Sequence, residues 1–533
     1  MSRRIWATLD DFLPPSKSNP YVGRNVANNV FFKALLRYST FDEFHFFLTN
    51  RAHIRLFEQE HGEFIQSVDA GPKIKVFLRE QLPEVIAQVD YTVFHQSDHI
   101  RAFNSLCYLR NQLGQFPVTA FIHSLSYQRY MHTYMAMSQG GVTASDAMLC
   151  STENGAEVVR RCLQQASTGI GKPMPDVQLQ VLPLGMDGAS MDFGDRTASR
   201  TALGFADTDV VGLCFGRFSD YDKMDLLPLL QGFRDASKDH PNWKLVLAGY
   251  VQSEDYLKIV EIWIRILGLS SSVIIERAPS DDRKAKLFRA SDMFISLSDN
   301  PQETFGLTLV EAMAAGLPLL VSDYDGYRNL VTEDVGRRVT TSWDRVDALA
   351  TLGPILDEAT YHRYLGQSLV VDMTDLRSKL TELYDNPTLR TELGQAARNK
   401  FLATYDCPVV IERLEQFWDK LKAAYKPIDS AGPDPSAMDF FETFGHYPTH
   451  MAKDDQPLQM SEFGQFLASK NSKYPLLAGM EGVISHDVIH WVNSHLDEHP
   501  TVEALVQAWP HSEWRMRYCV LWMLKHDLIQ HQQ

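Results

Sequence analysis

The sequence predicts an α/β protein of two domains, each built on a parallel sheet with helices on both faces, followed by a smaller, mainly helical extension. Two observations support this prediction. Short apolar segments of strand length alternate with longer segments of helical periodicity, most clearly after residue 209, and this alternation is typical of parallel sheets wound on both faces. The chain has 533 residues, whereas a single hydrophobic core stops growing at roughly 250 to 300 residues. We therefore expect at least two cores.

The later domain has the clearer pattern, and we assign it residues 199–425. Its expected strands are residues 210–215, 244–249, 273–276, 293–297 and 317–322, with helices between them. An alternation of this kind describes a Rossmann-like domain. Residues 342–370 interrupt the pattern as an inserted helical element, in which catalytic residue types form no obvious pattern.

The earlier domain, residues 1–198, reads as a second Rossmann-like domain with a less regular pattern. Its expected strands are residues 43–48, 91–94, 118–122, 147–150 and 180–182. The polar stretch 188–201, with little apolar content, is the expected linker between the two domains.

The extension, residues 430–533, follows a Pro- and Gly-containing hinge at residues 426–435. Its apolar residues between 502 and 529 have helical spacing, and the segment loosely resembles a winged-helix module. Acidic side chains outnumber basic ones here, which argues against DNA binding. We expect a helical module that binds a protein partner; unchanged partner binding and activity after deletion of residues 430–533 would refute this hypothesis.

Composition excludes several classes of protein. The formal charge of −16 arises entirely after residue 200, and nucleic acid is an unlikely partner because phosphate contacts need clustered Lys and Arg. The six cysteines are scattered without metal-ligand spacing. No run of about 18 apolar residues suggests a membrane span. We expect a cytoplasmic protein without a transmembrane segment, and a peripheral association with a membrane stays open.

The most informative segment is residues 301–318, Pro-Gln-Glu-Thr-Phe-Gly-Leu-Thr-Leu-Val-Glu-Ala-Met-Ala-Ala-Gly-Leu-Pro. It follows the expected strand 293–297 and therefore lies at the carboxyl edge of a parallel sheet, where open α/β folds bind ligands. Gly306 allows close backbone approach, and the helix that begins near Leu307 offers unpaired N–H groups to an anion. A diphosphate would fit there.

Two carboxylates flank this expected phosphate site. Glu303 precedes the helix and Glu311 lies more than a turn inside it, so the pair could span up to roughly 12 Å. Such carboxylates can accept hydrogen bonds from the hydroxyls of a sugar and of a ribose. Two isolated glutamates at a helix start are more often solvated residues that favour the helix dipole.

The whole frame from Glu303 to Glu311 closely resembles the Glu-x7-Glu motif of the retaining family-four glycosyltransferases, the glycosyl transferases group 1. The resemblance extends loosely over residues 1 to about 425 and is strong over residues 210–330. It implies the GT-B fold, in which two Rossmann-like domains face a cleft, and a nucleotide-sugar donor that is a substrate, not a cofactor.

A second element resembles the same family. Residues 211–218 form a strand that ends in Gly216 and Arg217, and Lys223 follows in the next loop. In the family the corresponding Arg and Lys bind the donor diphosphate. Both charges would balance the negative charge that grows on the leaving nucleoside diphosphate. Met224 departs from the usual glycine.

Three weaker matches follow the order of the family. His123 ends the strand of residues 118–122 and resembles the histidine that contacts the transferred sugar; a lone histidine after a strand is more often structural. Gly23, in Tyr-Val-Gly-Arg at 21–24, resembles a loop that approaches the diphosphate. Residues 183–187 resemble the turn into the linker. Residues 323–329 depart from the Gly-Gly-x-Pro-Glu of many relatives, so the donor sugar cannot be inferred from them.

Asp-x-Asp triplets at residues 207–209, 220–222 and 323–325 match a metal-binding pattern of other glycosyltransferases. Such triplets are frequent by chance, and Arg217, Lys223 and the helix start already supply positive charge. We predict no metal and no cofactor. No Gly-x-Gly-x-x-Gly follows a strand, which argues against a dinucleotide oxidoreductase.

The predicted function is retaining transfer of a hexose-type sugar to an acceptor hydroxyl, with Glu303, His123, Arg217 and Lys223 as catalytic residues. Gly23, Gly306, Leu307 and Glu311 complete the predicted donor site. Two alternatives stay open: a non-catalytic scaffold on the same fold, or a phosphorylase or epimerase. The donor sugar, its base and the acceptor (glycan, lipid, protein or small molecule) cannot be read from these residues.

Overall fold

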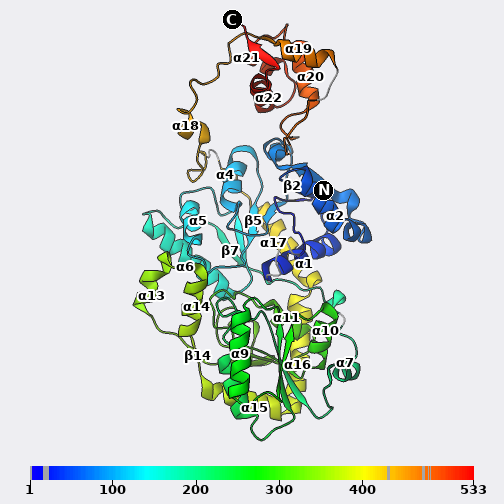
Figure 1. Cartoon of the computed structure of the whole chain (residues 1–533), viewed down its shortest axis with the longest axis vertical. Helices are drawn as coiled ribbons and strands as arrows, with labels where there is room; N and C mark the ends of the chain where they lie inside the picture. Colours follow the sequence, from blue (N-terminus) through cyan, green and yellow to red (C-terminus); the bar gives the residue numbers. More distant parts are fainter. Residues whose placement is uncertain are drawn as a thin grey trace.

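The computed structural model describes residues 3–15, 23–191, 193–428, 432–470, 474–477, 479–480 and 482–532. Three bodies follow one another along the long axis: the C-terminal unit, the first α/β domain and the second α/β domain (Figure 1). The predicted fold class, two parallel-sheet α/β domains with a helical extension, is confirmed. No helix in the described ranges is long and apolar enough to cross a membrane.

The first domain contains a seven-stranded sheet in the order β3-β2-β1-β4-β5-β6-β7, and every pairing is parallel. Its strands are β1 (Ile5–Thr8), β2 (Glu43–Leu48), β3 (Ile74–Leu78), β4 (Val93–Gln96), β5 (Val118–Phe121), β6 (Ala147–Cys150) and β7 (Gln178–Val181). The covering helices are α1 (Gly23–Tyr38), α2 (Arg51–Ser67), α3 (Leu82–Ile86), α4 (Phe103–Leu113), α5 (Tyr130–Met137) and α6 (Glu153–Gly169). The sequence pattern did not indicate β1 and β3.

The second domain contains a six-stranded parallel sheet in the order β10-β9-β8-β11-β12-β13. Its strands are β8 (Val210–Phe215), β9 (Trp243–Gly249), β10 (Val273–Arg277), β11 (Met293–Ser296), β12 (Leu319–Ser322) and β13 (Gly336–Val339). The covering helices are α8 (Leu227–Ala236), α9 (Glu254–Ile266), α10 (Asp281–Ala290), α11 (Leu307–Ala314), α12 (Tyr327–Leu330), α15 (Met373–Asp385) and α16 (Pro387–Lys400). The strand order reverses between β8 and β11, and ligands bind at such switch points.

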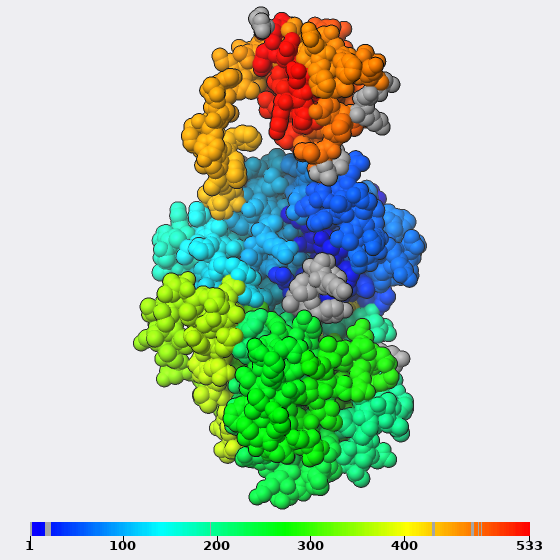
Figure 2. Space-filling view, viewed as in Figure 1, coloured from blue at the N-terminus to red at the C-terminus, as the bar shows by residue number. Residues whose placement is uncertain are grey.

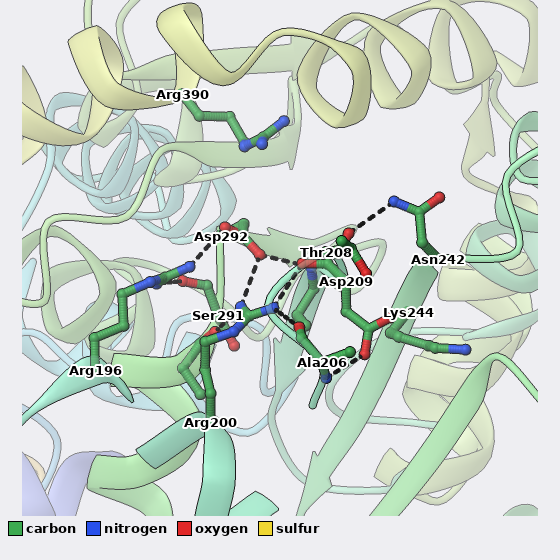
Figure 3. Close-up of polar contacts among 12 residues, drawn as sticks. Arg196, Arg200, Ala206, Thr208, Asp209, Asn242, Lys244, Ser291, Asp292 and Arg390 are labelled. Atoms are coloured by element: carbon green, nitrogen blue, oxygen red, sulfur yellow. Dashed lines mark hydrogen bonds and ion pairs between the residues drawn. The ribbon is translucent and has the colours of Figure 1, made fainter. Parts of the chain in front are cut away.

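The expected linker, residues 188–201, contains the start of a helix, α7 (Arg196–Leu203), which is fixed to the second domain. Figure 3 shows Arg196 and Arg200 of this helix directed at Asp292, at N–O distances of 2.7 and 3.4 Å. Arg200 also donates to the carbonyl of Ala206 at 2.7 Å, and Asp292 accepts from the backbone N–H of Val211 at 2.8 Å. The helix therefore moves with the second domain, and the change of domain occurs before it.

The chain crosses between the domains twice, and the two crossings lie side by side. The backbone N–H of Met186 donates to the carbonyl of Tyr405 at 2.9 Å, and that of Cys407 donates to the carbonyl of Met186 at 3.1 Å. The N–H of Gly188 donates to the side chain of Asp406 at 3.0 Å.

The range 199–425 assigned to the second domain ends in a helix, α17 (Cys407–Ala423), that packs on the first domain instead. Its apolar side chains are buried with those of α1 in one core, and the indole N–H of Trp418 donates to Thr119 in β5 at 3.2 Å. The apolar stripe of α17 is the physical reason why this helix packs on the first domain, because such a stripe has to be buried against another element.

The inserted element and the extension are both present. The insertion comprises α13 (Asp347–Leu352) and α14 (Glu358–Ser368) between two short antiparallel strands, β14 (Thr341–Ser342) and β15 (Val370–Val371). The C-terminal unit has a core of its own, formed by β16 (Leu458–Met460), α19 (Glu462–Ser469), α20 (His486–His495), α21 (Val502–Ala508), α22 (Glu513–Lys525) and β17 (Ile529–His531). The short helix α18 (Phe440–Phe444) lies in the segment that leads to this unit (Figure 1).

Candidate active site

The loop after β8 carries two of the predicted residues, Arg217 and Lys223. Gly249 makes room for this loop: its φ is +148°, and a Cβ there would lie 1.8 Å from the carbonyl oxygen of Gly216. Arg217 pairs with Asp222 at 3.3 Å, so the loop is held partly by its own charges. Lys223 points to the neighbouring strand end and pairs with Glu303.

Glu303 therefore lies within reach of both predicted cations. Its side chain is largely buried, with 19% exposed. Burial raises the pKa of the carboxyl, but the charges of Lys223 and Arg217 outweigh burial and hold the pKa below its ordinary value. Glu303 is an anion at neutral pH and is paired directly with the predicted phosphate-binding lysine.

Helix α11 begins at Leu307, as predicted, and Gly306 caps it. Gly306 has a φ of +96°, and a Cβ there would lie 2.6 Å from the ring of Tyr327. Only glycine fits both the conformation and the space. The open N–H groups at the start of α11 thus begin four residues after Glu303 at the carboxyl edge of the second sheet.

Glu311 is buried inside α11 and has a partner that the sequence did not reveal. Lys284 in α10 donates to its carboxylate at 2.6 Å. The ammonium group of Lys284 also lies 5.1 Å from the centre of the Phe215 ring. Lys284 and Glu311 are separated by 27 positions along the chain, so no local sequence pattern could have predicted this ion pair.

His123 lies at the carboxyl end of β5 and is buried. Its Nε2 atom is 2.9 Å from the side-chain oxygen of Asn28 in α1. Burial lowers the pKa of the imidazole to about 4, despite the nearby Asp98 carboxylate, so the ring is neutral at pH 7. The hydroxyl of Thr304 donates to the backbone carbonyl of His123 at 2.6 Å. His123, the predicted sugar-contacting residue, therefore lies against the loop that carries Glu303, which we call the Glu303 loop.

The other two matches in the first domain have different outcomes. Gly23 is the first residue of α1, and a Cβ there would meet nothing within 4 Å; Tyr21 and Val22 lie outside the described residues. The adjacent Arg24 pairs with Asp98 at 3.0 Å. In the segment 183–187, Asp187 accepts from Arg37 of α1 at 2.6 Å. It follows Met186 and therefore lies at the interdomain crossing.

The divergent loop 323–329 lies close to Glu303. Asp325 accepts from the hydroxyl of Ser298 and from the backbone N–H of Tyr327, both at 2.9 Å. Burial and the neighbouring Glu303 carboxylate raise its pKa well above the ordinary value. A Cβ on Gly326 would lie 2.1 Å from the carbonyl oxygen of Thr304, so this loop and the Glu303 loop are in close contact.

The edges of the two domains touch beside the site. Gln302 accepts from Ser126 at 2.8 Å and donates to Ser124 at 3.0 Å, and Thr152 donates to the carbonyl of Thr304 at 3.0 Å. The predicted residues of the two domains therefore lie near one contact between the domains: His123 from the first, and Arg217, Lys223, Glu303 and the start of α11 from the second.

The sequence did not single out Asp299, which supports the loop that carries Arg217 and Lys223. We call this loop the phosphate loop, after its predicted role. Its buried carboxylate accepts from the backbone N–H of Asp225 at 2.8 Å, two residues after Lys223. Burial raises the pKa of Asp299 to about 7. Because this folded-state pKa lies above the unfolded value, the protonated carboxyl stabilises the fold in acid, and that contribution is lost as the pH rises through 7.

Asp299→Asn is therefore expected to stabilise the protein at pH 8, since the amide keeps an acceptor for Asp225 and carries no charge. The pKa difference between 3.8 and about 7 corresponds to at most about 4 kcal/mol. Thermal unfolding from pH 5 to 8 measures the effect, and the advantage of the variant should shrink as the pH falls. The exposed Asp282→Asn in α10 is the control; a pH-independent difference for Asp299→Asn would contradict the assignment.

Comparison with solved structures identifies the architecture. HepE of Anabaena, in complex with UDP and glucose, aligns with a TM-score of 0.53 at 15% identity, over 78% of this chain and 100% of that chain. A glycosyltransferase from Rickettsia africae aligns with a TM-score of 0.53 at 12% identity, over 79% and 99%. The chain has the two-domain GT-B fold.

The sequence comparisons relate the second domain to a known family. Residues 195–352 match the glycosyl transferases group 1. A GDP-mannose:cellobiosyl-diphosphopolyprenol alpha-mannosyltransferase of Xanthomonas oryzae is 34% identical over 26% of this chain and 35% of its own length. An alpha-monoglucosyldiacylglycerol synthase of Streptococcus pneumoniae is 26% identical over 41% and 49%. The matches thus span at most about half of these relatives.

Proposed function

We propose that this protein is a retaining glycosyltransferase that moves a hexose-type sugar from a nucleoside-diphosphate sugar to an acceptor hydroxyl, without a metal ion. One observation carries the proposal. In the domain that matches the group 1 family, Lys223 pairs with the anionic Glu303, the charge of Arg217 also lowers the pKa of that carboxyl, and α11 begins four residues after it. A donor diphosphate needs positive charge of this kind at a sheet edge.

The diphosphate is held by Arg217, Lys223 and the N–H groups at the start of α11, next to Gly306 and Leu307. As the glycosidic bond breaks, negative charge accumulates on the departing phosphate, and these groups stabilise it. Because the ion pair of Lys223 with Glu303 occupies the lysine, donor binding exchanges one anionic partner for another. The carboxylate is then released toward the sugar hydroxyls.

The two ends of the donor meet residues from both domains. Glu303 accepts hydrogen bonds from hexose hydroxyls, and the neutral His123 forms a hydrogen bond with the hexose. Glu311, oriented by Lys284, accepts from the ribose hydroxyls. Retention follows a front-face course, in which the departing phosphate takes the proton of the acceptor hydroxyl. The protein contributes positioning and charge stabilisation.

Metal independence is supported by the partners of the Asp-x-Asp carboxylates. Asp220 is paired with Arg363 at 2.6 Å, Asp222 with Arg217, and Asp325 accepts two hydrogen bonds within its own loop region. Full activity in the presence of a strong chelator is the expected result, and loss that is restored by a divalent cation would refute this part of the proposal.

The acceptor can be a glycan, a lipid, a protein or a small molecule. The names of these relatives include a cellobiosyl-diphosphopolyprenol and a diacylglycerol lipid, two molecules of different chemistry. The cytoplasmic location and a protein partner for residues 430–533 stay predictions.

The test is a thermal-shift screen of the purified protein against UDP, GDP and ADP and their common sugar conjugates, with no metal added. Selective stabilisation by one nucleotide is expected, because a ligand that binds only the folded state raises the unfolding temperature. No stabilisation by any member of this panel would favour a non-catalytic scaffold over a transferase.

A further inference from the structure

The insertion lies against both α/β domains, although it is part of the second. In Figure 2 its yellow-green surface adjoins the first domain above and the second domain beside it. Helix α14 makes the contacts, whereas α13 has no buried residue. The short ribbon of β14 and β15 closes the insertion at its base.

One side of α14 holds the loop that carries Arg217 and Lys223. Arg363 donates to Asp220 at 2.6 Å, and Gln367 donates to Asp225 at 3.0 Å. The helix therefore fastens the loop at two points, one on each side of Lys223.

A third contact joins α14 to the same loop through Asn300, which lies three residues before Glu303. The buried side-chain amide of Asn300 donates to the carbonyl of Tyr221 and, at 3.3 Å, to the carbonyl of His362 in α14. Gly366 of α14 packs beside the same residues, since a Cβ there would be in ordinary van der Waals contact with the side chain of Asn300 at 3.6 Å. The phosphate loop, the Glu303 loop and α14 thus share one set of hydrogen bonds.

The other side of α14 contacts the first domain, a few residues after His123. The buried ring of His362 has its Nε2 atom 3.1 Å from the carbonyl oxygen of Ser126, and it packs 5.4 Å from the ring of Tyr127. Glu358 pairs with Arg129 at the surface. Ser126 in turn donates to Gln302 beside Glu303.

These contacts are poorly suited to a purely stabilising role. The ion pairs of Arg363 and Glu358 are partly exposed, and exposed pairs contribute little to stability. Their common property is position: each joins α14 to a loop that carries a predicted catalytic residue. The bonds from α14 to the first domain can form only when the two domains are close together.

We infer that α14 is a positioning element for the donor site, which sets the geometry of Arg217 and Lys223 and makes that geometry depend on contact with the first domain. The inference rests on the proposed function for the meaning of the site. Arg363, Gln367 and His362 act through the loops and do not touch substrate. The phosphate-binding charges of Arg217 and Lys223 then reach their correct positions when the two domains close.

The test uses the full chain with Arg363→Ala, Gln367→Ala and His362→Ala, and compares them with Arg345→Ala. Arg345 is a matched control, because it lies in the same insertion and its exposed side chain pairs with the exposed Asp347 of that insertion. Hydrogen exchange of residues 217–226 in the nucleotide-free protein is the first measurement. Faster exchange is expected in the first three variants and not in the control.

The second measurement is donor KM and kcat with the nucleotide sugar selected by the thermal-shift panel. Misplaced charges are expected to lower kcat/KM by about 10- to 100-fold in Arg363→Ala, with unfolding temperature near that of the control. The charge exchange Arg363→Asp with Asp220→Arg should recover most of the loss seen in Arg363→Asp alone, which a general packing role would not produce.

Unchanged exchange at residues 217–226 in all three variants would overturn the inference, as would equal losses in Arg345→Ala. Failure of the proposed function is a different result. In that case no nucleotide protects the wild-type protein, while the exchange measurement, which needs no ligand, still decides whether α14 orders the loop.

Discussion

Lys223→Ala is expected to reduce sugar transfer by about 100- to 1,000-fold, the effect of removing one preorganised charge from a transition state. It should also abolish stabilisation by the nucleoside diphosphate, because the lysine is the cation that Glu303 already holds at the site. Without Lys223 the pKa of Glu303 should rise, since burial then opposes ionisation with less compensation. Transfer rates and thermal shifts with the selected nucleotide measure both effects.

The control for Lys223→Ala is Lys258→Ala in α9, which removes an exposed lysine that pairs with Asp255 of its own helix. It should leave transfer and nucleotide stabilisation unchanged. Near-normal transfer by Lys223→Ala would refute its assignment as the diphosphate lysine. A lower unfolding temperature alone would not, because the variant leaves the Glu303 carboxylate buried with less charge around it.

Glu303→Gln is expected to affect the two ends of the donor site differently, with nucleoside-diphosphate binding retained and sugar transfer reduced. The amide preserves the shape of the side chain and removes its charge, so Lys223 becomes free to bind phosphate, and stabilisation by the nucleoside diphosphate should persist or increase. Transfer should fall by about 100-fold or more, because the carboxylate is the group assigned to the sugar. Parallel measurements of binding and turnover on this variant give the result.

Loss of nucleotide binding together with transfer in Glu303→Gln would mean that the glutamate organises the whole site. The nearby Glu276→Gln provides the control, since that glutamate pairs with Arg283 in α10 and is not among the predicted site residues. Near-normal transfer by Glu303→Gln would refute the assignment of the sugar-binding end.

The sequence predicted those features that have a local signature. Five of the six strands of the second sheet are apolar runs that the sequence pattern indicated, whereas β13 (Gly336–Val339) was not expected. The place of Gly306 before α11 was expected, and the structure needs glycine there because of its conformation and the ring of Tyr327. The convergence of Lys223 with Glu303 was implied by the family resemblance and by the rule that neighbouring strand ends meet at one sheet edge.

The features that the sequence missed depend on contacts between distant parts of the chain. The pair of Lys284 with Glu311, the support of the phosphate loop by Asp299 and the packing of α17 on the first domain leave no periodic pattern. The insertion is the clearest case, because residues 342–370 carry no catalytic pattern of their own, and their importance appears only when Arg363 is seen beside Asp220. Such pairings are set by the tertiary structure alone.

The paired crossings near Met186 and Tyr405 restrict how the two domains can move. A single flexible connection would allow the domains to rotate freely about it. Two connections that are hydrogen-bonded to each other through Met186 and Cys407 resist twisting about their common direction. Bending across the pair keeps those bonds intact. The pair of crossings therefore favours bending over twisting as the relative motion of the two domains.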